Sequence, residues 1–310
     1  MNKMKVVVSL ITLDNDYQIE QAVAAEQTAR SLGVDIQIIY ADSDAITQSQ
    51  QLLEIIQSNP DSHPNGIILE PAGGTGFPQV ARAAAKAGIG WVVLNRHVPY
   101  ISDLRKIYRT PLFCVSSDNK MVGRIQGNQF RALLPDGGSV LYIQGPSDSA
   151  AAMQRTEGML ETKGDIQVKP MRGQWTEASS YRAISSWLQL STSRQSHFDI
   201  IAAQNDAMAM GARQAFGELT QSDANQHWLG LPFLGVDGVR KTGLTWVKRG
   251  LLRATIVVPP NSSTALEMLA RALQTSVIPP EITTMSPAPF PSTEELRAAH
   301  SMNKYASTQP

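Results

Sequence analysis

The fold of this 310-residue chain is decided by the segment Ile200-Ile201-Ala202-Ala203-Gln204-Asn205-Asp206-Ala207-Met208-Ala209-Met210-Gly211-Ala212. Its first residues form an apolar run typical of a buried strand, and the small residues after Asp206 are typical of a helix. Polar side chains therefore follow the carboxyl end of a strand. In open parallel sheets ligands bind at that edge, because loops converge there and helix N-termini point free N–H groups toward it. The segment predicts an α/β fold with a binding edge.

A second strand-end pattern follows further along the chain, as Phe233-Leu234-Gly235-Val236-Asp237-Gly238. Two polar strand ends in one parallel sheet lie at the same edge, so a shared site is expected. Asn205 and Asp206 are also residue types that cap helices. Because Asp206 is adjacent to the helix, we interpret it as a cap. We interpret Asn205 and Asp237 as ligand contacts.

Strand and helix patterns alternate along the chain. In the first half, the pattern predicts strands at residues 5–11, 35–41, 66–70 and 91–94, and helices at residues 19–32, 45–57 and 79–87. In the second half, it predicts strands at residues 139–144 and 166–171, and helices at residues 121–134, 151–163, 177–190 and 293–300. The repeated β-α-β order favours parallel, doubly wound sheets. Because 310 residues exceed what one hydrophobic core usually organises, we expect two such lobes.

The charge balance gives no support to a nucleic-acid partner. Lys plus Arg and Asp plus Glu both number 27, so no overall field attracts a polyanion. The first strand begins near Lys5, which leaves no room for an N-terminal helix-turn-helix domain. No apolar run approaches the ~20 residues of a transmembrane helix, so direct membrane insertion is not expected.

Cys114 is the single cysteine, which excludes an intramolecular disulfide. It lies in the apolar run of residues 112–115, and we interpret it as a small buried hydrophobe. The N-terminal residues lead directly into a strand, without the apolar segment of a signal peptide. We therefore expect a periplasmic protein if a signal peptide has been removed, and a cytoplasmic one otherwise.

Further segments, taken together with the two strand-end patterns, carry a family resemblance. They are Leu94-Asn95-Arg96, Ser117-Asp118-Asn119, Gly123-Arg124-Ile125-Gln126-Gly127, Ala151-Ala152-Met153-Gln154-Arg155-Thr156-Glu157-Gly158 and Ala254-Thr255-Ile256. From about Lys5 to about Pro287 the chain resembles the ribose-type family of type I periplasmic sugar-binding proteins of ABC transporters. That family shares its fold with the effector domains of LacI-type repressors. Each motif is weak alone, and the ordered set is specific.

The resemblance implies a type I periplasmic-binding-protein fold with three hinge crossings. The expected N-terminal lobe is residues 1–117 plus 259–288, and the expected C-terminal lobe is residues 118–258 plus 289–310, with a ligand cleft between them. The local sequence is compatible, since Pro259-Pro260 and Pro287-Ala288-Pro289 prevent a continuous helix and favour extended segments.

The resemblance also implies a set of ligand contacts: Asn15, Tyr17, Asn95, Arg96, Asn119, Arg155, Trp175, Asn205 and Asp237. Arg155 would donate to sugar hydroxyls, since a guanidinium offers five fixed donors and no acceptor. Tyr17 and Trp175 would stack on the faces of a sugar ring. Alternative interpretations are a turn for Asn15, a surface or ion-paired arginine for Arg96, and a core residue for Trp175.

Two positions depart from the family pattern. Asn95 stands where the family normally has Asp, and Val258 stands where members often have Gln. One carboxylate acceptor and one amide are thus missing. We therefore expect a preference for something other than plain ribose, such as a deoxy sugar, a modified hexose or a polyol.

The predicted function is capture of a small sugar or polyol by hinge closure, for ABC-type uptake or signalling, with no catalysis, cofactor or metal. The expected partners are the sugar and an ABC permease or membrane sensor, and the expected state is a monomer. Glycine-rich residues 73–76 lack the phosphate-loop patterns, and the five histidines show no metal-ligand spacing. A cytoplasmic sugar sensor without a DNA-binding domain is the alternative. A glycoside-processing enzyme that uses Asp118 and Asp237 ranks third.

Overall fold

A computed structural model describes residues 3–74, 76–191, 193, 196–219 and 227–306. The chain divides into two compact units. Unit 1 comprises Met1–Ser117 and Pro259–Met285, and unit 2 comprises Asp118–Val258 and Ser286–Pro310. The chain therefore passes between the units three times. Residues 307–310 of the predicted C-terminal lobe, like the other residues outside these ranges, are not described.

Unit 1 is built on a single parallel sheet. Its strands are β1 (Lys5–Leu10), β2 (Asp35–Tyr40), β3 (Gly66–Leu69), β4 (Gly90–Leu94), β5 (Leu112–Ser117) and β11 (Ile282–Met285). They lie in the order β11-β5-β4-β3-β1-β2, and every pair is parallel. The chain winds outward in both directions from β1 and β3, which makes the carboxyl ends of these two strands the switch point of the sheet.

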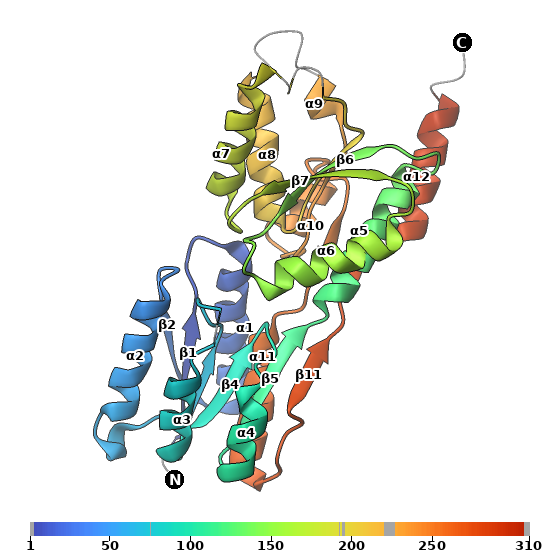
Figure 1. The fold of residues 1–310 in the computed structure, drawn as a ribbon. Coiled ribbons are helices and arrows are strands. Elements are labelled where there is room, and N and C mark those ends of the chain that lie inside the picture. Colours follow the sequence, from blue (N-terminus) through green and yellow to red (C-terminus); the bar gives the residue numbers. More distant parts are fainter. Residues whose placement is uncertain (1–2, 75, 192, 194–195, 220–226, 307–310) are drawn as a thin grey trace. The chain divides into compact units, whose positions relative to one another are not determined.

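Different helices cover the two faces of this sheet (Figure 1). One face carries α2 (Ala45–Gln57), α3 (Pro78–Lys86) and α4 (Tyr100–Ile107), and the other carries α1 (Asp16–Leu32) and α11 (Asn261–Thr275). Strand β1 shows that both faces of the sheet are covered. Val7 packs in the core formed with α2, α3 and α4, while Val6 and Val8 pack in the core formed with α1 and α11. Because side chains alternate along a strand, a run of consecutive apolar residues in a strand requires cover on both sides.

Unit 2 repeats the arrangement with a smaller sheet. Its strands are β6 (Ser139–Gln144), β7 (Gln167–Arg172), β8 (Ile200–Ala203), β9 (Phe233–Leu234), β10 (Thr255–Val257) and β12 (Ala288–Phe290). The parallel sheet has the order β7-β6-β8-β9, while β10 and β12 form an antiparallel pair. Isolated parallel bridges join Leu234 to Ala254 and Asp237 to Val257.

The helices of unit 2 also divide between two cores. One core holds residues of α7 (Glu177–Leu188), α8 (Asp206–Leu219), α9 (His227–Gly230) and α10 (Gly243–Lys248), and the other holds residues of α5 (Asn119–Leu133), α6 (Ala150–Thr162) and α12 (Thr293–Ala306). Glycines bring α5 and α6 together: a Cβ on Gly123 would lie 2.0 Å from the carbonyl oxygen of Arg155. A Cβ on Gly158 would lie 2.0 Å from that of Lys120.

The two doubly wound parallel sheets predicted from the sequence are confirmed. Most predicted elements are present with shifted ends. Helix α1 begins at Asp16 rather than at residue 19, because Asn15 caps it. Cys114 is fully buried, as predicted. The third passage between units follows Met285, and β12 beyond it pairs with β10 of unit 2.

Helix α4 and the segments α11 and β11 carry no signal that the sequence interpretation used. Each is short or begins with small polar residues, so periodicity alone does not reveal it. Within the described ranges, no helix is both long and apolar enough to cross a membrane.

Candidate functional site

In unit 2, Arg155 is the centre of a side-chain cluster at the carboxyl edge of the sheet. It projects from α6 and is buried, with 7% of its surface exposed. Its Nε donates to Asn119 Oδ1 at 2.9 Å, and its Nη1 donates to the carbonyl oxygen of Gln204 at 2.5 Å. The same Nη1 lies 3.7 Å from Asp237 Oδ1. One guanidinium thus contacts residues from α5, from the end of β8 and from the loop after β9.

Trp175 joins this cluster from the loop after β7. The Arg155 guanidinium carbon lies 5.5 Å from the centre of the Trp175 ring, a cation–π distance. The indole packs on Gly145, where a Cβ would come within 2.2 Å of the ring. Asn205 Nδ2 donates to the Trp175 carbonyl oxygen at 2.8 Å. The structure therefore brings five predicted contacts together: Asn119, Arg155, Trp175, Asn205 and Asp237.

The interpretation of Asp206 as the helix cap is wrong. Asn205 caps α8, because its Oδ1 accepts from the backbone N–H of Met208 at 2.9 Å. Asp206 is the first residue of the helix, and its carboxylate is turned toward the chain beyond β9. It accepts from the N–H of Gly238 at 2.8 Å and from the hydroxyl of Thr255 at 2.7 Å. Asp206 thus stabilises the loop that carries Asp237, through its bond to Gly238.

The backbone is strained at three predicted contacts. Seven non-glycine residues in the described part of the chain have positive φ, and three of them are Asn95 at 57°, Trp175 at 64° and Asp237 at 107°. A side chain in this region costs free energy that glycine would avoid. Such strain concentrates where a particular side chain is needed in a particular direction. The loop of Asp237 is also fixed by backbone bonds, since its N–H donates to Ile256 and its carbonyl accepts from Val258.

In unit 1, two predicted contacts follow β1. Asn15 Oδ1 accepts from the N–H groups of Tyr17 and Gln18 at 2.9 and 3.2 Å, and so caps α1. Tyr17 is buried, and its hydroxyl donates to the carbonyl oxygen of Pro259 at 3.2 Å. Both side chains therefore also fix backbone near the binding edge.

The other two contacts of unit 1 follow β4. Arg96 donates to the carbonyl oxygens of Gly73 and Gly74 at 2.6 and 3.2 Å, and to that of Pro71 at 3.4 Å. It therefore holds the glycine-rich loop through backbone carbonyl oxygens. Asn95 Oδ1 accepts from Asn261 Nδ2.

Sequence reasoning missed two residues at these edges. Gln204 is fully buried: its Oε1 accepts from the N–H of Gly145, and its Nε2 donates to Tyr142, Ala152 and Thr156. Glu70 follows β3 and accepts from Gln18 Nε2 at 2.8 Å. Both are polar residues at the end of an apolar strand, so the signal that identified Asn205 was also available for them.

Two further groups of residues bear on a metal site and on an acid/base pair. Within the described residues, no group of three or more His, Cys, Asp and Glu side chains is placed to hold a metal ion. Asp118, the proposed partner of an acid/base pair, caps α5 by accepting from the N–H of Met121 at 2.8 Å. One oxygen of its carboxylate thus accepts a hydrogen bond from the backbone.

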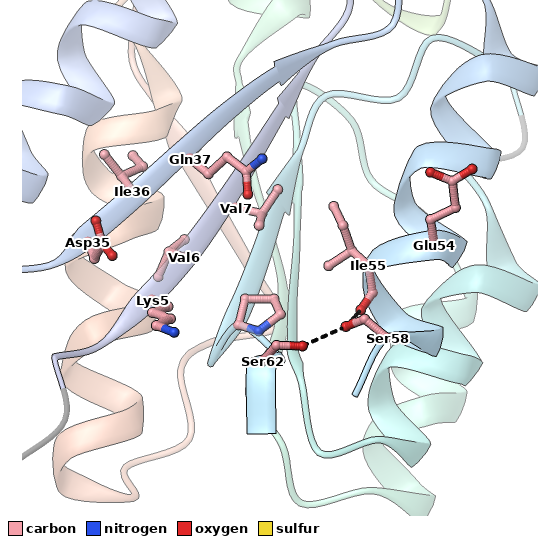
Figure 2. Close-up of a pocket in the computed structure, with 11 residues that line it drawn as sticks. Lys5, Val6, Val7, Asp35, Ile36, Gln37, Glu54, Ile55, Ser58 and Ser62 are labelled. Carbon is pink, nitrogen blue, oxygen red and sulfur yellow. Dashed lines mark hydrogen bonds between the residues drawn. The ribbon is translucent and has the colours of Figure 1, made fainter. Parts of the chain in front are cut away.

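A surface pocket of about 360 Å³ lies at the amino-terminal edge of the unit 1 sheet (Figure 2). It lies between the starts of β1 and β2 and the end of α2, and its polar lining includes Lys5, Asp35, Gln37, Glu54 and Ser58. Ser58 and Ser62 bond to each other across 3.1 Å. No predicted contact lines this pocket, and it faces away from the edge at which parallel sheets bind ligands.

Comparison with known proteins gives a consistent result. The family model described as the periplasmic binding protein domain matches residues 6–276. The D-allose-binding periplasmic protein of Escherichia coli is 26% identical, over 88% of this chain and 86% of its own length. The ribose import binding protein of Escherichia coli is 24% identical, over 84% of this chain and 81% of its own length.

Solved structures agree on the fold. A periplasmic solute-binding protein from Actinobacillus succinogenes with bound D-allose matches with a TM-score of 0.78 at 20% identity, covering 96% of this chain and 100% of its own. The Caulobacter myo-inositol-binding protein with bound myo-inositol matches with a TM-score of 0.76 at 20% identity, covering 97% of each chain.

Proposed function

This chain belongs to the periplasmic binding protein family, and we propose that within it the chain captures a small sugar or a sugar-like polyol. The observation that supports this most is the cluster of Arg155 with Asn119, Asp237 and Trp175. Relatives named for D-allose and ribose, and a structural neighbour with bound myo-inositol, support the same ligand class.

The cluster has the chemistry that a polyol requires. Each hydroxyl both donates and accepts, so a ring with neighbouring hydroxyls needs donors and acceptors side by side. Arg155 supplies donors, and Asp237 supplies a carboxylate 3.7 Å from it. Trp175 supplies an aromatic surface, whose negative face suits the polarised C–H groups of a sugar. The remaining predicted contacts, Asn15, Tyr17, Asn95, Arg96 and Asn205, stay part of the proposed site.

We propose that binding is coupled to hinge closure between the predicted lobes, residues 1–117 plus 259–288 and residues 118–258 plus 289–310. A ligand that contacts both lobes binds the closed state better than the open one, and so shifts the population toward it. Saturating ligand should therefore lower the radius of gyration in solution scattering. Confirmed binding with an unchanged scattering profile would count against closure.

The proposed role is delivery rather than catalysis. If the protein is exported, the loaded form would pass its sugar to an ABC permease or signal to a membrane sensor. We propose that it acts as a monomer, without cofactor, metal or nucleic acid. The partial commitment of Asp118 to the cap of α5 supports the absence of a glycosidase mechanism.

A thermal-shift screen tests the proposal. The panel contains D-allose, D-ribose, D-xylose, xylitol, myo-inositol, deoxy sugars and amino sugars, and a ligand that binds only the native state raises the melting temperature by mass action. Capture predicts a saturable rise for at least one member and no release of aryl alcohol from aryl glycosides. Failure of every sugar and polyol to stabilise the protein, or enzymatic turnover, would overturn the proposal.

A further inference from the structure

Asn261 is a buried residue that binds the side chain of the predicted contact Asn95. It is the first residue of α11 and is fully buried. Its Nδ2 donates to Asn95 Oδ1 and to the hydroxyl oxygen of Ser117, the latter at 3.3 Å. All three residues belong to unit 1, at the carboxyl edge of its sheet.

These bonds determine which end of the Asn95 amide remains for a ligand. A primary amide has two donor hydrogens on nitrogen and acceptor lone pairs on oxygen. Both hydrogens of Asn261 are used, one on Asn95 and one on Ser117. Since Asn95 Oδ1 is turned toward Asn261 and accepts from it, the Nδ2 donor of Asn95 is the end of the amide directed away from Asn261.

Two further observations favour a positioning role for Asn261. Its buried Oδ1 has no hydrogen-bond partner within the described residues, which makes the side chain costly for stability alone. Asn95 itself has φ of 57°, a conformation that costs free energy and fixes the direction of its Cβ. Both Asn95 and Asn261 therefore cost stability. What they provide is a fixed direction for the Asn95 amide.

We infer that Asn261 is a positioning residue that turns the Asn95 amide so that a donor faces the ligand. The inference rests on the proposed sugar-binding function and specifies its selectivity. A carboxylate at position 95 would demand a hydroxyl donor from the ligand. The oriented amide instead donates to any ligand oxygen, so the ligand class includes sugars or polyols with an acceptor-only oxygen at this position, such as an O-methyl ether or a carbonyl.

The test compares each parent polyol with its methyl ethers. The probes are myo-inositol and D-allose and the mono-O-methyl ethers of each, and the quantity is the ratio of Kd for the ether to Kd for the parent. Asn261→Asp supplies only acceptors, so it forces Asn95 to donate inward and to turn its oxygen toward the ligand. At one ring position the ratio is expected to rise by about 10-fold or more in Asn261→Asp and in Asn95→Asp, and to stay at the wild-type value in the control Asn59→Asp.

Asn59 is a suitable control because, unlike Asn261, it bonds through its Oδ1, as the cap of the 3₁₀ turn Pro60–Ser62, and an aspartate keeps that bond. Unchanged ratios in a folded Asn261→Asp protein would overturn the inference. If this variant does not fold, a double-mutant cycle with Asn95→Ala and Asn261→Ala replaces it. The inference predicts that Asn261→Ala has no effect on Kd once Asn95 is Ala, and additive effects would overturn it.

The outcome is distinguishable from a failure of the proposed function. If the wild-type protein binds none of these probes and no other member of the thermal-shift panel, the choice of sugars and polyols as ligands is wrong. If the wild type binds them and only the Asn261 variants behave as wild type, the proposed function stands and the positioning role is wrong.

Discussion

The binding edges of the two units use similar residues in different ways. In unit 2, predicted contacts bind one another: Arg155 contacts Asn119, Asp237 and the ring of Trp175. In unit 1, predicted contacts mainly bind backbone: Arg96 holds carbonyl oxygens of the loop after β3, and Asn15 caps a helix. A polar residue at a strand end can therefore either stabilise the loops at that edge or form part of the binding site. Unit 2 has a cluster of polar side chains that bond to one another. In unit 1 the polar side chains stabilise the loops at the edge, and Asn95 is the contact that we infer to be directed toward the ligand.

The largest expected effect is loss of the assembled cluster. Arg155→Ala is expected to weaken binding of the sugar found in the thermal-shift screen by more than about 100-fold, because hydrogen bonds to a charged group contribute about 1.5–3 kcal/mol each. The Asp237 carboxylate also loses its cationic neighbour. Affinity is measured by calorimetry, and circular dichroism establishes that the variant is folded. A folded Arg155→Ala protein with wild-type Kd would contradict the assignment of the site to this cluster.

The cluster can also be broken through the backbone that carries it. Gly123→Ala places a Cβ 2.0 Å from the Arg155 carbonyl oxygen, so α5 and α6 must separate. We expect a loss of about 1–3 kcal/mol in the free energy of unfolding, as for other overpacked sites, together with weaker binding. Denaturant titration measures the first effect.

Gly217→Ala is the matched control, since its Cβ would meet no atom closer than 3.9 Å. In the helix α8 an alanine there should be neutral or stabilise by about 0.5–1 kcal/mol. If Gly123→Ala behaved like this control, the close contact of α5 and α6 would not be what positions Arg155.

A smaller effect is expected from the bracing arginine of unit 1. Arg96→Ala removes three hydrogen bonds to the loop at Pro71, Gly73 and Gly74. Because the guanidinium acts on the loop, we expect affinity to fall by about 10-fold, less than in Arg155→Ala. Arg30→Ala, which removes only an exposed pair with Glu26, should change affinity negligibly. An equal fall in affinity in Arg96→Ala and Arg155→Ala would contradict the difference that we draw between the edges of unit 1 and unit 2.

The smallest effect is expected at Cys114, whose buried thiol reports on the opening of unit 1 alone. Burial raises the pKa of this thiol from its ordinary value of 9.0 to about 11. In that interval the unfolded chain binds fewer protons than the folded one, so the free energy of unfolding falls as pH rises from about 9 toward about 11. A thiol reagent at pH 8 should label the native protein only as fast as unit 1 opens. Immediate labelling of the native protein, or stability that rises with pH across this interval through this thiol, would contradict its burial.

The sequence was sufficient for the two parallel sheets and for the strand ends at which Asn95, Asn205 and Asp237 lie. It did not reveal which of Asn205 and Asp206 caps α8, because both residue types can do so and the choice depends on Thr255 and Gly238. It also could not reveal Asn261. That residue acts through Asn95, 166 positions away, and pairing over such a distance leaves no periodic trace.

We propose that Arg155 and Asp237 of the unit 2 cluster hydrogen-bond to the hydroxyls of the sugar. Calorimetric titration of wild type and Asp237→Asn with the sugar found in the thermal-shift screen tests it most directly, because the substitution keeps the shape of the side chain and removes its charge. We predict saturable binding to the wild type and a loss of about 10-fold to 100-fold in affinity for Asp237→Asn, with the melting temperature of the free protein little changed. Sugar binding by the variant with the Kd of the wild type would contradict the claim.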